Sequence, residues 1–214
     1  MSYYRASGET REVMRRTGTD RFTDRLQDAS PHTHRHSKAV AEIAMGVGSL
    51  ARVPDDIMIQ LGLSGHLHDI GKMSPKILGL VEAPRRLTRT ELGKVRDVHT
   101  TEGHRMITGR VKASTGYQGL LRTAAYVALH HHDSPEELPG DQHQQVARDV
   151  TGLIHVIDRF EATQSGDRPY QSGPATSPET AASRVEAEVD IQPFYGLDPG
   201  QVMAAVVSSV QVNR

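Results

Sequence analysis

The sequence predicts an all-α fold, in which five core helices form a bundle and further helices follow at the C-terminal end. Several long segments carry apolar residues every three or four positions, the spacing of a helix face buried against a core. No segment of useful length alternates between apolar and polar residues as a half-buried strand does. Aromatic residues make up only 4% of the chain and Trp is absent, so we expect an aliphatic core, as in helical proteins.

Residues 1–30 differ from the rest of the chain, because they are polar, rich in Arg and Thr, and poor in apolar positions. We expect a loose N-terminal arm that contains one short helix. Residues 31–214 then form a single domain, with a core over about 31–165 and a C-terminal helical extension over 166–214. A chain of 214 residues is long enough for one sizeable core.

The helices are expected in a simple order along the chain. The five core helices span 33–52, 55–70, 88–109, 119–132 and 145–164. Thr88 and Glu91 form a capping box at the start of the third helix. The connecting and C-terminal segments are loops over 73–87 and 133–143, a Gly-, Pro- and Ser-rich stretch over 165–178, a short helix over 179–189, a turn over 193–199 and a last helix over 200–210.

The bulk composition excludes several kinds of site. The formal net charge is −1, so we expect no basic face that binds long nucleic acid. The absence of Cys excludes disulfides, Cys-ligated zinc and iron–sulfur clusters. No apolar run approaches the ~18 residues that span a bilayer, and the N-terminus lacks an apolar signal segment. We therefore expect a cytoplasmic protein with no membrane partner.

Histidine is the unusual feature of the composition, because most of the 12 histidines fall into internal clusters. The clusters are His32, His34 and His36; His66 and His68; His99 and His104; and His130, His131 and His132. The most informative stretch is HDIGK, from His68 to Lys72. Its imidazole suits a transition metal, its carboxylate can bridge two ions, and its lysine can neutralise a phosphate oxygen. This stretch therefore indicates a metal-assisted phosphoryl site.

Further ligands lie on the other expected helices. His36 begins the first core helix, His99 lies within the third, and His131 and His132 end the fourth. Asp158 interrupts the apolar fifth helix, where a buried lone carboxylate is costly unless it is paired or coordinated. Helical proteins build metal sites from inward-facing side chains on several helices, so we expect these residues to converge.

The order of these residues resembles that of the HD phosphohydrolase superfamily, and the neighbouring sequence resembles its HD-GYP branch. HSKAVA resembles the branch's HSxRVA, HDIGK equals its central motif, and VHTTEG resembles its HPxxG segment. DRFEA followed by DRPY resembles DVFDAL and DRPY, and LDP near the end resembles FDP. The resemblance covers about residues 30–210 and implies an HD-domain helical bundle.

The resemblance also implies a metal-dependent phosphodiesterase with two divalent metal ions. The implied ligands are His36, His68, Asp69 and Asp158 for one ion, and His99, His131 and His132 for the other, with Asp69 bridging both. Fe or Mn is favoured, and Ni, Co, Mg and Zn stay open. A metal-bridging hydroxide would attack the phosphate. Asp69 and Lys72 would be catalytic, with Lys72 stabilising charge on the phosphoryl group. Arg168 is a weaker candidate for a phosphate contact.

The implied substrate is a cyclic dinucleotide, with cyclic di-GMP as the first candidate. The loop after His132 departs from the branch, because HHHDSPEELPG stands where HHExxDGxGYP is expected and Gly-Tyr-Pro is absent. Another nucleotide or phosphate ester therefore stays open as the substrate. A di-iron oxygenase and a catalytically silent nucleotide-binding module are the remaining alternatives. The expected partners are a small nucleotide, a second copy of the chain in a homodimer, and a regulatory protein.

Two details of the ligand set stay open. His32 lies one turn before His36, where some relatives carry a Glu that supports a third metal, so His32 is a candidate ligand for a third ion. In the triple histidine, we favour the pair His131 and His132, because Asp133 then takes the acidic position that follows the pair. The register with His130 and His131 is the alternative.

Overall fold

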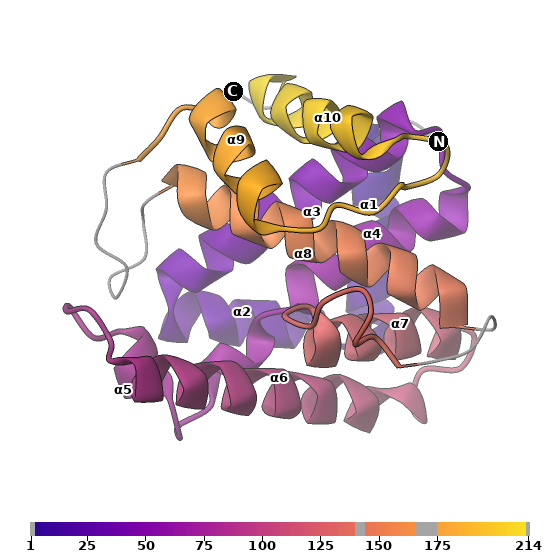
Figure 1. Ribbon diagram of the computed structural model, residues 1–214. Helices are drawn as coiled ribbons and strands as arrows, with labels where there is room; N and C mark the ends of the chain where they lie inside the picture. The colour runs from indigo at the N-terminus through magenta and orange to yellow at the C-terminus, as the bar shows by residue number, and fades with distance from the viewer. Residues whose placement is uncertain (1–2, 140–143, 166–174, 213–214) are drawn as a thin grey trace.

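The computed structural model describes residues 3–139, 144–165 and 175–212, and within them it is all-α, as predicted (Figure 1). These residues form ten α-helices and one 3-10 helix, and they contain no strand. The elements are α1 Tyr3–Thr17, α2 Asp20–Ala29, α3 Pro31–Leu50, α4 Asp55–Leu67, η1 Ile70–Met73, α5 Leu78–Val81, α6 Arg89–Val111, α7 Gln118–His130, α8 Gln145–Ser165, α9 Pro178–Glu188 and α10 Pro199–Val212. The five expected core helices correspond to α3, α4, α6, α7 and α8.

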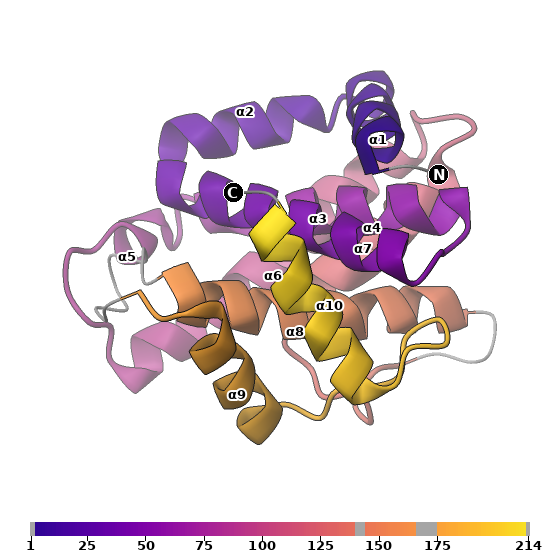
Figure 2. The same ribbon diagram turned by 90° about the horizontal axis from the view of Figure 1, so that it is seen from above.

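The N-terminal residues differ from the expectation of a loose arm with one short helix, which is wrong. They form two helices: α2 runs along one edge of the molecule, and α1 lies beside one end of α2 and is seen nearly end-on (Figure 2). Helix α1 packs on α4 and buries Ala6, Val13 and Met14, and α2 packs on α3 and buries Leu26. These few apolar residues are spaced by helical turns, so they suffice to hold the helices in place. The division of the chain at residue 30 stays a prediction.

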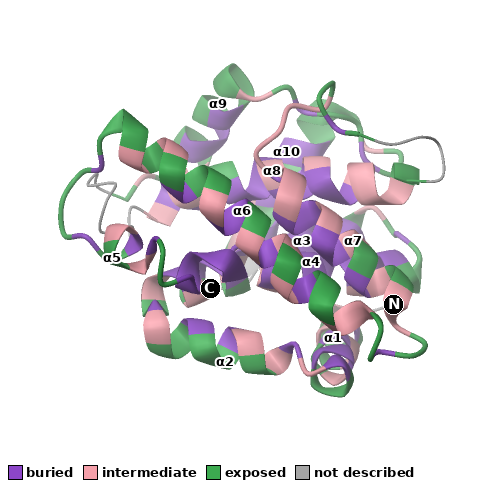
Figure 3. Cartoon of the chain, turned by 90° about the horizontal axis from the view of Figure 1, so that it is seen from below, coloured by how far each residue is buried: buried purple, intermediate pink, exposed green. Residues whose placement is uncertain are grey.

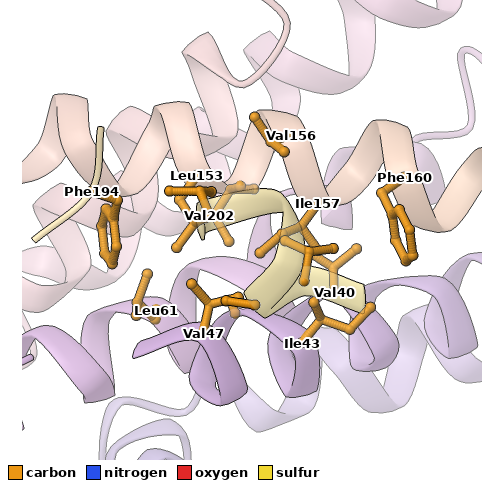
Figure 4. Packing of buried hydrophobic residues seen from close by; sticks show 14 of the residues in the cluster. Val40, Ile43, Val47, Leu61, Leu153, Val156, Ile157, Phe160, Phe194 and Val202 are labelled. Atoms are coloured by element: carbon orange, nitrogen blue, oxygen red, sulfur yellow. The ribbon is translucent and has the colours of Figure 1, made fainter. Parts of the chain in front are cut away.

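The main hydrophobic core lies between α3, α8 and the C-terminal helices (Figure 4). Val40, Ile43 and Val47 follow one another along the buried face of α3. Val40 and Ile43 lie toward Ile157 and Phe160 of α8, and Val47 lies nearer Leu153. The spacing of three and four residues along α3 is the apolar pattern seen in the sequence. Helix α10 packs on α3 and adds further buried residues to this cluster. The C-terminal helices therefore belong to the same core.

The second core helix ends earlier than expected, and this change shapes the site. Helix α4 ends at Leu67 instead of residue 70, and the chain then turns into η1. Gly71 of η1 lies against the backbone of α6, where an added Cβ would be 1.9 Å from the carbonyl oxygen of His99. Only glycine allows this approach of the two backbones. The close packing brings Asp69 beside His99.

Two smaller findings concern loops and helix starts. The expected loop over 73–87 contains the short helix α5. The capping box at the start of α6 is confirmed, because the Thr88 side chain accepts from the backbone N–H of Glu91 and the Glu91 side chain accepts from that of Thr88. The central segments of α3 and α4 are mostly buried, while α2 and α6 show exposed outer faces (Figure 3). Among the described residues, no helix is both long and apolar enough to cross a membrane.

Candidate metal centre

The residues that the sequence selected as metal ligands come together in two adjoining groups. One group holds His36, His68 and Asp69, and the other holds His99, His131 and His132, with the potential ligand atoms of each group within 4.8 Å of one another. Asp158 joins the first group, since its Oδ1 lies 2.9 Å from His36 Nε2. All of them are buried except His132, which is partly buried.

Five helices and two turns position these side chains. His36 comes from α3, His99 from α6 and Asp158 from α8. The remaining residues lie where helices end: His68 directly after α4, Asp69 directly before η1, and His131 and His132 directly after α7. These segments lie far apart in the chain, so the cluster forms only when the whole bundle packs.

Asp69 lies between the two groups, and each of its oxygens faces one of them. Asp69 Oδ2 is 3.4 Å from His68 Nε2 and 3.6 Å from His36 Nε2. Asp69 Oδ1 is 3.4 Å from His99 Nε2 and 3.8 Å from His131 Nε2. A carboxylate with one oxygen directed to each of two ligand groups can bridge two cations.

Backbone carbonyls fix the orientation of three imidazoles. The Nδ1 atoms of His68, His99 and His131 lie 2.8, 2.7 and 3.1 Å from the carbonyl oxygens of Gly65, Val95 and Val127, respectively. A carbonyl only accepts, so each Nδ1 must carry the hydrogen and donate it. In the neutral ring, Nε2 then keeps its lone pair and directs it toward Asp69. This is the arrangement in which histidine binds a metal through Nε2.

The Nε2 atoms of three histidines lie close together at the centre. His99 Nε2 is 3.3 Å from His131 Nε2 and 3.2 Å from His132 Nε2. With Nδ1 of His99 and His131 protonated, their Nε2 atoms face each other as two lone pairs. Such a contact is repulsive unless a cation lies between the nitrogens.

Two buried polar atoms at the centre, His68 Nε2 and Asp69 Oδ1, have no hydrogen-bond partner among the described residues. A buried polar atom left unsatisfied costs about 1–3 kcal/mol. Both atoms are also well-suited metal ligands, one an imidazole nitrogen and the other a carboxylate oxygen. The chemistry of this centre therefore fits bound cations.

The protonation states of the histidines around His99 and of Asp69 are those that bind metal ions. Burial lowers the pKa of His99 to about 4, and burial also holds the pKa values of His131 and His132 well below their usual range. These imidazoles are therefore neutral at pH 7, which is the form that binds metals. For Asp69, burial opposes ionisation, but Lys72 and His68 outweigh it and hold the pKa of Asp69 well below its usual range. Asp69 is therefore a carboxylate.

Glu161 is a member of the site that the sequence reasoning missed. Its Oε2 accepts a short hydrogen bond from His36 Nδ1, so the carboxylate orients the ring from the side opposite Nε2. The available signal was its spacing, because Glu161 follows Asp158 by three residues and shares its face of α8. A carboxylate on the outer nitrogen of a ligating histidine raises the basicity of the ligand.

The histidines near the centre divide into inward and outward ones. His130 Nδ1 lies 2.8 Å from Asp133 Oδ2, so His130 faces away from Asp69. His155 Nδ1 donates to the backbone carbonyl of His131 at 2.6 Å and thereby supports the turn that carries His131 and His132. The structure brings His131 and His132, rather than His130, to the centre.

The two remaining candidates have different outcomes. His32 belongs to neither ligand group, and its Nδ1 lies 3.3 Å from Glu82 Oε1. A third metal therefore stays a prediction. Arg168 lies outside the described residues.

A cleft of about 290 Å³ opens onto the centre between α6 and α8. It is lined by Lys72, Leu92, Val95, Arg96, His99, His132, Asp158, Arg159, Ala162 and Thr163, and we call it the α6–α8 cleft. Lys72 is buried at its inner end, where Nζ lies 2.5 Å from Asp69 Oδ2. A ligand in this cleft would meet the ammonium group and the inward histidines together.

Comparison with known proteins gives one curated relative. A protein of Pseudomonas aeruginosa that is named a cyclic di-GMP phosphodiesterase is 32% identical over 155 residues, which are 70% of this chain and 34% of the relative. The chain thus matches about a third of the length of that relative. No family model matches the chain, and no solved structure matches it.

Proposed function

We propose that this chain is a metal-dependent phosphodiesterase of the HD-GYP type that hydrolyses a cyclic dinucleotide. The observation that carries the proposal is the position of Asp69, whose two oxygens face two groups of inward-directed histidines. The relative supports it independently, because that protein is named for hydrolysis of cyclic di-GMP.

The proposed ligands follow the two groups around Asp69. His36, His68, Asp69 and Asp158 would hold one divalent ion, and Asp69, His99, His131 and His132 would hold the second. A set of imidazoles and carboxylates without sulfur suits Fe or Mn. When bound, the ions would supply Lewis acidity to the phosphoryl group and lower the pKa of water to near neutrality.

The protein's own contribution is to bind and orient the phosphate. Lys72 is held in place by Asp69 and lines the inner end of the α6–α8 cleft. Its ammonium group would stabilise negative charge on the phosphoryl oxygens as the ester bond breaks. Glu161 and the three backbone carbonyls hold the histidine rings, so little reorganisation is needed when the substrate arrives.

Cyclic di-GMP is the first candidate for the substrate, on the strength of the relative. The absence of Gly-Tyr-Pro after His132 keeps another nucleotide or phosphate ester as the alternative. Fe(II)- or Mn(II)-loaded protein should therefore be tested with cyclic di-GMP, mixed cyclic dinucleotides, linear dinucleotides and nucleoside phosphates.

The test of the function is the loss of hydrolysis in Asp69→Ala. Turnover of the true substrate should fall to background, because the variant removes the carboxylate that both ligand groups share. Asp24→Ala is the matched control, since Asp24 is an exposed carboxylate on α2, and it should keep full activity. Full activity in Asp69→Ala would show that the proposed mechanism is wrong.

A further inference from the structure

The α6–α8 cleft has a buried inner end and an exposed rim, and the two carry different groups. The inner end holds Lys72, His99 and Asp158, which are buried. The rim carries Arg96 on the α6 wall and Arg159 on the α8 wall, with side chains 53% and 47% exposed. Helices α6 and α8 cross the molecule at different levels in Figure 1, with α6 below α8. The two guanidinium groups therefore approach the cleft from different helices.

The residues that line this cleft are more positively charged than the chain as a whole. Among the described residues that line it, Lys72, Arg96 and Arg159 are cationic, and Asp158 is the one carboxylate. The whole chain has a formal net charge of −1. The residues that line the cleft thus carry more positive than negative charge, while Asp69, Asp133 and Glu188 pair with the three cations from outside the lining. An anionic ligand is favoured where it takes the place of the partly exposed carboxylates Asp133 and Glu188.

A single phosphate at the inner end does not account for the two arginines. Lys72 and the proposed metal ions would neutralise a phosphate there, next to His99 and Asp158. Arg96 and Arg159 lie at the rim instead, so they can meet a second anionic group of the same ligand. Guanidinium groups bind phosphate oxygens through paired hydrogen bonds.

The present contacts of the two arginines are weak enough to be exchanged for a ligand. Arg159 Nη2 pairs with Glu188 Oε2 at 2.5 Å, and the Glu188 side chain is 57% exposed. Arg96 Nη2 donates to the carbonyl oxygen of His132 at 2.9 Å and lies 3.4 Å from Asp133 Oδ1. Exposed ion pairs of this kind contribute about 0–1 kcal/mol. A phosphate between the two walls can therefore replace these two ion pairs at little cost.

We propose that Arg96 and Arg159 form a clamp for a second phosphate group, so that this site selects substrates with two phosphates over substrates with one. The inference rests on the proposed phosphodiesterase function and names the substrate class of that site. A cyclic dinucleotide carries two phosphodiester groups and fits this class. One phosphate would lie beside Lys72 for hydrolysis while the other is held at the rim.

The clamp is tested by kinetics on two substrates with the metal-loaded protein. Cyclic di-GMP has two phosphodiester groups, and bis(p-nitrophenyl) phosphate has one. Arg159→Ala should raise the KM for cyclic di-GMP about tenfold, the effect of one lost charge-assisted hydrogen bond, and leave the kinetics on the one-phosphate substrate unchanged. Arg96→Ala should show the same selective effect. Glu188→Gln should lower the KM for cyclic di-GMP, because it releases Arg159 from its present partner.

The matched control is Arg105→Ala, because Arg105 is an exposed arginine on α6 that is ion-paired to Glu102 and does not line the cleft. It should leave both substrates unaffected. An unchanged KM for cyclic di-GMP in Arg159→Ala overturns the clamp. Equal losses on both substrates also overturn it, because the arginines would then support the centre itself rather than a second phosphate.

A binding measurement separates the clamp from the proposed function. Equilibrium dialysis of chelator-treated protein with cyclic di-GMP should give a Kd about tenfold weaker for Arg159→Ala than for the wild type. Binding that depends on Arg159, without hydrolysis by the metal-loaded wild type, would support the clamp and reject the phosphodiesterase. Hydrolysis of cyclic di-GMP that does not depend on Arg96 or Arg159 would support the phosphodiesterase and reject the clamp. No binding by the wild type overturns the clamp.

Discussion

Glu161 affects the centre through His36, which it contacts on the nitrogen that faces away from Asp69. Replacing it with Gln keeps the size of the side chain but removes the negative charge that raises the basicity of the ring. We expect Glu161→Gln to weaken metal binding about tenfold, measured by metal titration with a competing chelator. Glu179→Gln, at an exposed position in the first turn of α9, should bind metal like the wild type. Equal affinities in both variants would contradict an orienting role for Glu161.

The triple histidine gives a second prediction at the residue scale. His131 faces Asp69, whereas His130 pairs with Asp133. We therefore expect His131→Ala to lose metal on dialysis and His130→Ala to retain it, as measured by elemental analysis. The opposite result would assign the other register, with His130 as the ligand.

The sequence selected the residues of the centre well, because its ordered motifs name them directly. His36, His68, Asp69, His99, His131, His132 and Asp158 all come together, although their binding of metal stays a proposal. Glu161 and the two rim arginines were not selected. Their importance depends on which helix faces which, and a motif read along one chain does not contain that information.

Gly71 allows η1 to pack directly against the backbone of α6. An alanine Cβ there would lie 1.9 Å from the His99 carbonyl oxygen and 2.7 Å from the Gly103 backbone nitrogen. Backbone atoms cannot move aside as a flexible side chain can, so Gly71→Ala should lower the free energy of unfolding by about 3 kcal/mol, the upper end of the usual cost of overpacking. Urea denaturation measures this.

The control for this prediction is another glycine, on helix α6, against which η1 packs. Gly93 lies within α6 and an added Cβ there meets no atom within 4 Å. Gly93→Ala should stabilise the protein by about 0.5–1 kcal/mol, the usual gain in helix propensity. A Gly71→Ala variant as stable as the wild type would show that the two backbones do not pack as described.

Helices were predicted from the sequence where a regular apolar face or a capping box marks them. Helices α3 and α8 have long apolar faces, and their ends fall within two residues of the expected positions. The width of the apolar face did not decide how well their ends were placed, because α6 has few buried residues and its ends also fall within two residues of the expected positions. Helix α1 buries Thr10 and Thr17 beside its few apolar residues, so its inner face is partly polar. The helical spacing of apolar residues is therefore weak in this part of the sequence. That is why residues 1–30 were expected to be loose.

At the scale of the whole molecule, the centre joins α3, α4, η1, α6, α7 and α8, so bound metal should stabilise the entire bundle. A ligand at 100 times its Kd adds about 2.7 kcal/mol of stability. For a chain of this size, that corresponds to a rise in Tm of about 5–10 °C. Calorimetry of metal-loaded and chelator-treated protein measures the difference. An unchanged Tm would indicate that no metal binds to the folded bundle.

The central claim is that Asp69 joins two metal sites, and metal stoichiometry tests it most directly. Protein loaded with Mn(II), dialysed and measured by elemental analysis should contain two ions per chain. Asp69→Asn, which keeps the shape but not the charge of the side chain, should contain fewer than one. Two ions retained in Asp69→Asn, or none bound by the wild type, would contradict the account.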